Sequence, residues 1–236
     1  ITGNNADNYL IGNAGSDTIN GGGGQDVITG DAGVDFLFGG DGNDVISELT
    51  TISVDGDTID GGNGIDILYA NFGNDTVTGG TDGANNYANL GEGNDSYQGS
   101  AGTDVVEGGN GIDTIAGNNG DDSLYGDGGN DIITGGAGID LLSGSIGDDN
   151  LDGGGDNDLL VGDAGNDTLN GGGGIDVLYG FADNDVLNGG AGLDGLYGGA
   201  GSDDFRYATT GVNQEYLWDF VGGAGASDRL VFSTTV

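Results

Sequence analysis

Apolar and acidic residues recur along this chain with a period of nine residues. The segment 153–188 reads as four lines, GGGDNDLLV, GDAGNDTLN, GGGGIDVLY and GFADNDVLN, each with Asp at position six and Leu at position eight. Position eight is Leu, Ile, Val, Tyr or Phe in all 22 lines of the chain, from Leu10 to Phe205. The lines begin at Gly3, Gly12, Gly21, Gly30 and Gly39, at Ile52, Gly61, Ala70 and Gly79, and at every ninth residue from Leu90 to Gly198.

Each line predicts a turn followed by a short strand. The Gly-rich positions one to six tolerate positive φ, and positions seven to nine alternate outward, inward and outward as a strand does. Two lines then make one turn of a flattened helix. The sequence therefore predicts an all-β fold, a parallel β-roll of about eleven coils over residues 1–206, with irregular turns at 48–57, 79–85 and 89–95.

The chain carries 40 acidic and two basic residues, which gives a net charge of −38, and it holds no His or Cys. This composition disfavours nucleic acid as a partner and excludes thiolate metal sites, disulfides and His-dependent catalytic triads. The sequence also holds no apolar run of transmembrane length. Hard cations with oxygen ligands suit so acidic a surface.

Position six is the predicted metal ligand. Stacked coils would bring carboxylates to about 5 Å from one another, where they repel by about 3 kcal/mol at an effective dielectric of 20. A cation between them removes this repulsion, and Ca²⁺ is the best candidate because it accepts six or more oxygens in flexible geometry. Asn8 and Asn85 fill position six in two lines, and the others carry Asp17, Asp26, Asp35, Asp44, Asp57, Asp66, Asp75, Asp95, Asp104, Asp113, Asp122, Asp131, Asp140, Asp149, Asp158, Asp167, Asp176, Asp185, Asp194 and Asp203.

The lines GGNGIDTIA (108–116), GGAGIDLLS (135–143) and GGGGIDVLY (171–179) carry the full pattern G-G-x-G-x-D-x-U-x, where U is apolar. With them, residues 3–206 resemble the repeats-in-toxin (RTX, hemolysin-type) nonapeptide family, a known calcium-binding β-helix signature. The resemblance implies that each Ca²⁺ lies between turns of successive coils, held by position-six carboxylates and backbone carbonyls. It implies ligand pairs such as Asp17 with Asp35, and at most about twenty ions.

Departures from the pattern predict empty or weak sites. They are Asn8, Asn85, the lengthened turns before Asp57, Asn85 and Asp95, and the Asp residues that replace the position-four Gly, Asp156 and Asp183. In this alignment ELTT (48–51) is an insertion and Asn89 is an extra residue. Ile1 and Thr2 fit the last two places of a line, so we expect the chain to be a piece of a longer one.

Residues 207–236 depart from the nine-residue period and are predicted to be a C-terminal capping segment. Capping is needed because an exposed terminal strand edge invites aggregation. The apolar residues predicted to cover the open end of the core are Trp218, Phe220, Leu230 and Phe232.

The outward positions of alternate lines differ in polarity. Even lines carry mostly Thr, Asn and Asp at these positions. Binding of ice or polysaccharide by this polar face is a minor alternative function. Odd lines are apolar or aromatic at 15 of 22 places, a larger patch than soluble monomers normally expose. We expect this face to contact another copy or a neighbouring domain through Tyr9, Ile11, Val27, Val45, Ile67, Tyr69, Ala88, Val105, Tyr125, Leu141, Leu159, Val161, Val177, Tyr179 and Tyr197.

Three functions are compatible with this pattern. The first is a noncatalytic, calcium-loaded structural segment of a secreted or cell-surface bacterial protein, in a surface layer, sheath, filament or matrix. The second is the C-terminal calcium-dependent secretion and folding module of a type I secreted enzyme or toxin. The third, a glycosidase using paired carboxylates, is the weakest, because no Asp pair stands apart from the repeat.

Overall fold

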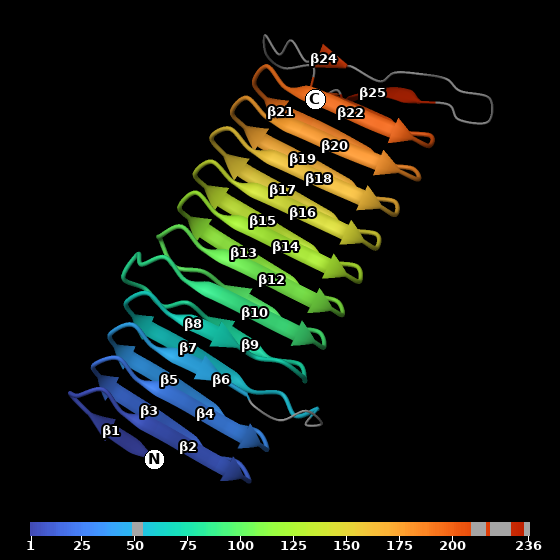
Figure 1. The fold of residues 1–236 in the computed structure, drawn as a ribbon. Coiled ribbons are helices and arrows are strands. Elements are labelled where there is room, and N and C mark those ends of the chain that lie inside the picture. The colour runs from blue at the N-terminus through green and yellow to red at the C-terminus, as the bar shows by residue number, and fades with distance from the viewer. Residues whose placement is uncertain (49–53, 209–215, 218–227, 234–236) are drawn as a thin grey trace.

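The computed structural model describes residues 1–48, 54–208, 216–217 and 228–233, which form 25 strands and no helix. All strand pairs within the two sheets are parallel, and the chain alternates between the sheets at every strand (Figure 1). The coils stack from the N-terminal to the C-terminal end without reversing (Figure 1). The predicted parallel β-roll of about eleven coils is confirmed.

The 13-stranded sheet, here sheet A, contains the odd-numbered strands. They are β1 (Thr2–Asn4), β3 (Thr18–Gly23), β5 (Phe36–Asp41), β7 (Thr58–Asn63), β9 (Thr76–Thr78), β11 (Ser96–Gln98), β13 (Thr114–Asn119), β15 (Ile132–Ala137), β17 (Asn150–Gly155), β19 (Thr168–Gly173), β21 (Val186–Ala191), β23 (Asp204–Ala208) and β25 (Arg229–Ser233).

The 12-stranded sheet, here sheet B, contains the even-numbered strands. They are β2 (Tyr9–Ala14), β4 (Val27–Ala32), β6 (Val45–Ser47), β8 (Ile67–Tyr69), β10 (Tyr87–Glu92), β12 (Val105–Asn110), β14 (Ser123–Gly128), β16 (Leu141–Ile146), β18 (Leu159–Ala164), β20 (Val177–Ala182), β22 (Gly195–Ala200) and β24 (Tyr216–Leu217).

The core between the sheets is built from the position-eight side chains. Register is kept from coil to coil: Leu124 pairs with Leu142, which pairs with Leu160. From Ile19 to Phe205 these side chains are at most 1% exposed. At the N-terminal end Leu10 is only partly buried, because few strands precede it. A shift by one residue would move every one of these side chains outward, so the apolar column fixes the register.

The line from Gly79 to Asn89 is aligned differently from the sequence prediction. Ala88, expected on the outer face, pairs with Leu68 and Val106 and is fully buried. Asn89 pairs with Tyr69 and Glu107, so it is the ninth position and not an extra residue.

Asn86, not Asn85, therefore occupies position six of this line. The Asp66 N–H donates to Asn86 Oδ1 at 3.0 Å, as position-six residues do elsewhere. Asn85 accepts from the Thr103 N–H at 2.9 Å, as position five of the next line, Asn94, does from Ile112. The turn has two added residues, and the sequence alone did not fix where they lie.

Glycine is required in the turns because successive coils approach closely. In the intact line 108–116, Gly109 and Gly111 have φ of 101° and 140°. A Cβ on Gly111 would lie 1.5 Å from the carbonyl oxygen of Gly93, one coil earlier. Any side chain here would clash with backbone and strain φ as well.

The C-terminal strands extend both sheets by one strand each. β24 pairs with β22, and β25 pairs with β23 with Leu230 opposite Phe205. Leu230 is 38% exposed, whereas Phe205 is fully buried. Trp218 and Phe220 lie outside the described residues, so the capping role of 207–236 stays a prediction.

We expect Gly111→Ala to lower the free energy of unfolding of the calcium-loaded roll by at least about 2 kcal/mol, from overpacking and a left-handed backbone. Urea unfolding followed by circular dichroism measures this change. Gly173→Ala is the control, because a Cβ there meets nothing within 4 Å. Equal midpoints for the two variants would contradict the stacking argument.

Candidate metal centre

The position-six carboxylates form one continuous ladder along each edge of the roll. The Asp113 N–H donates to Asp131 Oδ1, and the Asp122 N–H donates to Asp140 Oδ1, both at 2.8 Å. The same bond recurs at 2.7–3.0 Å from the pair Asn8 and Asp26 to the pair Asp185 and Asp203. From Asp26 onward, each carboxylate is thus tied by one oxygen to the coil before it.

The second oxygen of most of these carboxylates is buried and has no hydrogen-bond partner within the part of the chain that the structure describes. A buried acceptor left unpaired costs about 1–3 kcal/mol, and more when charged, so a whole column of them needs a physical explanation. The residues concerned, each at most 3% exposed, are Asp26, Asp35, Asp44, Asp66, Asp75, Asp95, Asp113, Asp122, Asp131, Asp140, Asp149, Asp158, Asp167, Asp176, Asp185 and Asp194.

These oxygens face the first glycine of their own line and a carbonyl of the next coil. A Cβ built on Gly135 would lie 2.3 Å from Asp140 Oδ2 and 2.7 Å from the carbonyl oxygen of Gly153. Gly171 has the same surroundings, with Asp176 Oδ2 at 2.5 Å and the Gly189 carbonyl oxygen at 2.6 Å. Carboxylate and carbonyl oxygens thus lie around the same point.

Burial makes the charge on these carboxylates expensive. Burial raises the pKa of Asp75 to about 8, partly offset by the Asp57 N–H, with further increases from the Asp95 and Asp57 charges. Burial likewise raises the pKa of Asp66 and of Asp185 to about 7. Side chains of this protein cannot neutralise the columns, because the chain has only two basic residues. One of them, Arg229, is paired with Asp204.

The donor set fits a hard divalent cation. The donors are all oxygen atoms, and at least one at each site belongs to a carboxylate. Several such oxygens surround each site, which is how proteins bind Ca²⁺. The unpartnered oxygen of Asp140 and the Gly153 carbonyl are examples of groups that would hold the ion. The bound ion supplies charge neutralisation, while the carboxylates and carbonyls orient it between two coils.

Fold and site together define a repeat protein whose coils are joined through cation-binding edges. The family model of the RTX calcium-binding nonapeptide repeat matches residues 2–37, 11–46, 53–83, 81–106, 89–111, 107–142, 134–169, 143–178, 161–196 and 179–207. The chain belongs to this family, whose repeats bind Ca²⁺. The comparison with curated proteins gave no match. Among the described residues, nothing forms a helix that could cross a membrane.

All twenty predicted ligand residues lie at position six, from Asp17 on one edge and Asp26 on the other to Asp203. From Asp26 onward each is at most 4% exposed, and Asp17 is half-buried near the first coil. The ladder also reaches beyond the repeat, since the Asp203 N–H donates to Asp228 Oδ1 at 3.3 Å. The sequence pattern missed Asp228 because residues 209–227 separate it from the period.

Beside Asn86, the carboxylate column differs in its hydrogen bonds at Asp104. Asp104 Oδ2 accepts the Ser100 N–H at 2.9 Å and is therefore satisfied by protein. The Asn86 amide donates to the Gly79 carbonyl at 3.0 Å, and the Tyr97 hydroxyl lies near the same glycine. This step of the ladder carries one carboxylate fewer and is held by hydrogen bonds.

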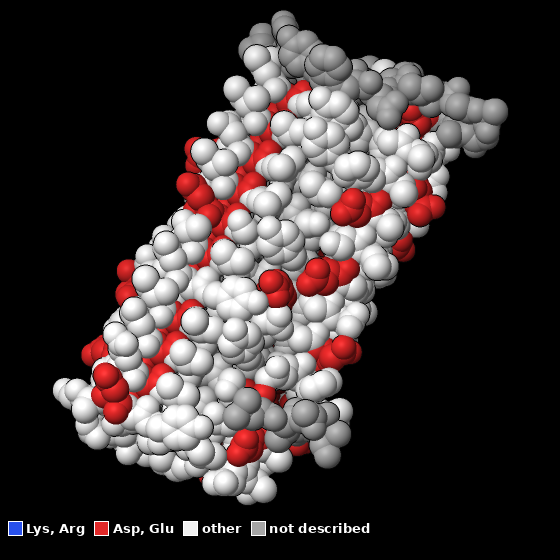
Figure 2. Space-filling model, viewed as in Figure 1, with Lys and Arg blue, Asp and Glu red and all other residues white. Residues whose placement is uncertain are grey.

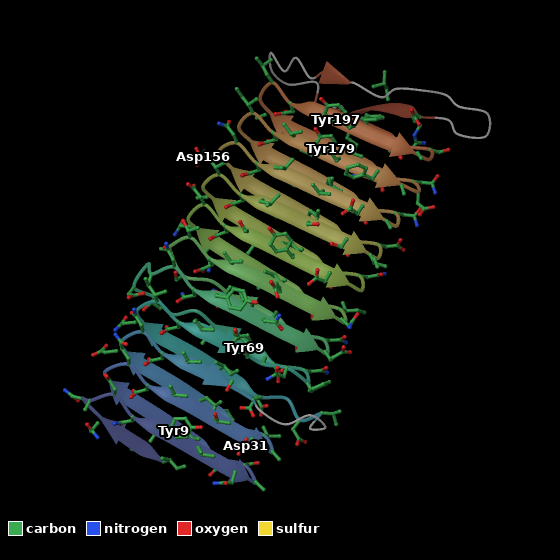
Figure 3. All side chains as sticks on the ribbon, viewed as in Figure 1. Tyr9, Asp31, Tyr69, Asp156, Tyr179 and Tyr197 are labelled. Atoms are coloured by element: carbon green, nitrogen blue, oxygen red, sulfur yellow. The ribbon has the colours of Figure 1, made fainter. Side chains whose placement is uncertain are left out.

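Asp156 and Asp183 do not disturb their turns. Their φ values of 75° and 77° are left-handed, as for the glycine they replace. Their carbonyl oxygens approach Gly174 and Gly201 in the next coil, as glycine carbonyls do elsewhere. Asp156 lies in one of the turns along the edge of the roll (Figure 3). Weak binding at these turns stays a prediction, and the backbone gives no reason for it.

Sequence reasoning missed Glu48 as a site residue. One oxygen from each of Asp35, Glu48 and Asp57 lies within 4.8 Å of the other two. Burial raises the pKa of Glu48 to about 9, with further increases from Asp57 and Asp35. Its place in the sequence could have revealed it. Glu48 directly follows Ser47 and so takes the first position of a line, which is Gly in most other lines.

In chelator, stability of the fold should fall as the pH rises. The pKa values of Asp66, Asp75 and Asp122 are raised from 3.8 to about 7, 8 and 7 in the folded chain. The folded state therefore binds protons more tightly, and this contribution is present below the unfolded pKa and lost as the pH passes through the raised values. We expect the β signal in circular dichroism to decline between about pH 5 and pH 8.

Saturating calcium should reverse this dependence, because the ion needs deprotonated ligands. A β signal in chelator that is constant across the same pH window would contradict the argument.

Proposed function

We propose that this chain is a noncatalytic structural segment of a secreted bacterial protein that folds when it meets extracellular calcium. The observation that carries the proposal is the pair of buried carboxylate columns with unpartnered oxygens. At low calcium inside a cell the columns repel themselves, and the chain stays unfolded and exportable. Extracellular calcium modules typically bind at about 10⁻⁴–10⁻³ M, which suits such a switch.

On this proposal the ligands are the twenty Asp residues at position six, with carbonyls of the adjoining turns. Twenty is an upper limit on the ions. Asn8 and Asn86 contribute no charge, and Asp104 Oδ2 is already hydrogen-bonded. The commitment of the buried position-six carboxylates to the edges of the roll supports a noncatalytic role.

A matched pair of substitutions tests the ligand assignment. Asp122 is 1% exposed and lies in the column, while its neighbour Asp121 is exposed. We expect Asp122→Asn to raise the calcium concentration at the folding midpoint several-fold, because one ligand charge is lost while Oδ1 can still accept its hydrogen bond. Asp121→Asn removes the same charge and should leave the midpoint nearly unchanged. Equal shifts in a calcium titration followed by circular dichroism would disprove the assignment.

The outer face of sheet B supports assembly. Tyr9 is 66% exposed, and Tyr69 and Leu159 are each 37% exposed. Figure 2 shows this face, where acidic side chains line the left edge, further acidic patches lie in the middle and on the right, and most of the remaining surface is neither acidic nor basic. Tyr179 and Tyr197 are stacked with ring centroids 4.6 Å apart, on neighbouring strands β20 and β22 (Figure 3).

We infer that a second copy of the chain covers this face and that repetition of the contact builds a surface layer, sheath, filament or matrix. A flat sheet of many coils with preordered aromatic side chains loses little side-chain entropy on association. Calcium at the two edges neutralises the acidic rims that would otherwise repel a second copy. We also propose that the chain works outside the cell, because calcium is abundant there.

The alternative is a C-terminal secretion and folding module of a type I secreted enzyme or toxin. One observation favours it: the described strands β24 and β25 continue the two sheets beyond the repeat. In this case sheet B would contact an attached domain or remain in solvent. An isolated chain would then fold with calcium and stay monomeric.

Charge on sheet B separates the two functions. We expect the double variant Leu159→Glu/Tyr179→Glu to fold at the wild-type calcium concentration but to lose the calcium-dependent rise in light scattering. Thr114→Glu/Thr134→Glu is the control, with one outward residue changed on each of two neighbouring strands of sheet A. A rise in scattering that survives in the sheet B variant, or is absent in the wild type, would contradict self-assembly.

A further inference from the structure

The interrupted line after β6 places a carboxylate where the repeat has backbone. Glu48 directly follows Ser47, the last residue of β6, and its N–H donates to the Tyr69 carbonyl at 3.1 Å. It therefore begins the next line, at the place where Gly39 and Gly61 begin theirs. The sequence alignment had set Glu48 aside as part of an insertion.

Gly30 lies one coil before Glu48, and comparing its surroundings with those of the first glycine in a regular turn shows what this change does. In regular turns, a Cβ on Gly21 would meet Asp26 Oδ2 at 2.3 Å and the Gly39 carbonyl oxygen at 2.5 Å. At Gly30 the corresponding atoms are Asp35 Oδ2 at 2.4 Å and Glu48 Oε1 at 2.3 Å. The Glu48 carboxylate thus stands in the place of the carbonyl, and a full negative charge replaces a dipole.

Burial and the absence of partners single out this cluster. Glu48 is 3% exposed, and among the described residues neither of its carboxylate oxygens has a hydrogen-bond partner. Asp35 is fully buried with Oδ2 unpartnered, and Asp57 is 4% exposed. Oxygens of the three residues lie within 4.8 Å of one another. A buried carboxylate with both oxygens unpartnered has no reason to point at two others unless a cation lies among them.

We propose that Asp35, Glu48 and Asp57 form a calcium site of higher affinity than the regular turns, which loads before them. Ligand charge tunes the affinity of calcium sites, and this site has one carboxylate more than a turn built on a carbonyl. The inserted line is then the strongest cation site of its edge, whereas the sequence pattern had marked it as empty or weak. The proposal rests on the proposed calcium-dependent folding and adds an order of loading to it.

Equilibrium dialysis with calcium, counted per chain across free concentrations, tests the proposal. We expect Glu48→Gln to lose one ion from the tightest class, with that site weakened at least about tenfold, while later binding is retained. Glu92→Gln is the control, since Glu92 is exposed in another turn.

The outcomes are distinguishable. If the wild-type chain binds no calcium, both the proposed function and this site are wrong. If the wild type binds calcium and Glu48→Gln gives the same binding isotherm, only this site is wrong. If Glu48→Gln does not fold at saturating calcium, Glu48→Asp decides. Recovery of folding and of the tight ion by this charged variant supports the site, and failure of both variants overturns it.

Discussion

Burial of like charges is the constraint on which this structure depends. Most coils place a carboxylate at each edge, tie one of its oxygens to the neighbouring N–H and leave the other inside, facing oxygen atoms. Such columns cannot stay ionised by themselves. The apolar core is one thin layer between the two sheets, to which each sheet contributes one column of side chains. On the proposed function, folding and cation binding are therefore one equilibrium.

The unusual composition follows from repeating this site. Gly stands first in most lines because the carboxylate of the same line occupies the volume a side chain would need, as at Gly135 beside Asp140. Other glycines allow left-handed backbone and the close approach of carbonyls from one coil to the next, as at Gly111. Basic side chains are almost absent because a mobile cation, not a fixed one, neutralises the columns. On the proposed function, this makes folding responsive to the calcium around the chain.

Period and residue type were enough to predict both sheets, the core column and the twenty position-six carboxylates. They failed where spacing alone could not decide. The line from Gly79 to Asn89 can be aligned in more than one way, because Asn85 and Asn86 both fit position six and Tyr87 and Ala88 both fit the core position. Only the pairing with Leu68 and Val106 selects Ala88. Glu48 was missed because an insertion hid its place in the line. The second oxygens of the ladder, and the bond from Ser100 to Asp104, depend on three-dimensional contacts that no period encodes.

The most direct test of the central claim is circular dichroism of the unmodified chain, first in chelator and then in calcium rising to about 10 mM, with magnesium as the control. Magnesium demands a tighter octahedron and keeps its waters, so it should not substitute. The account predicts a β spectrum that appears with calcium and disappears when chelator is returned. A full β spectrum in chelator at neutral pH would contradict it.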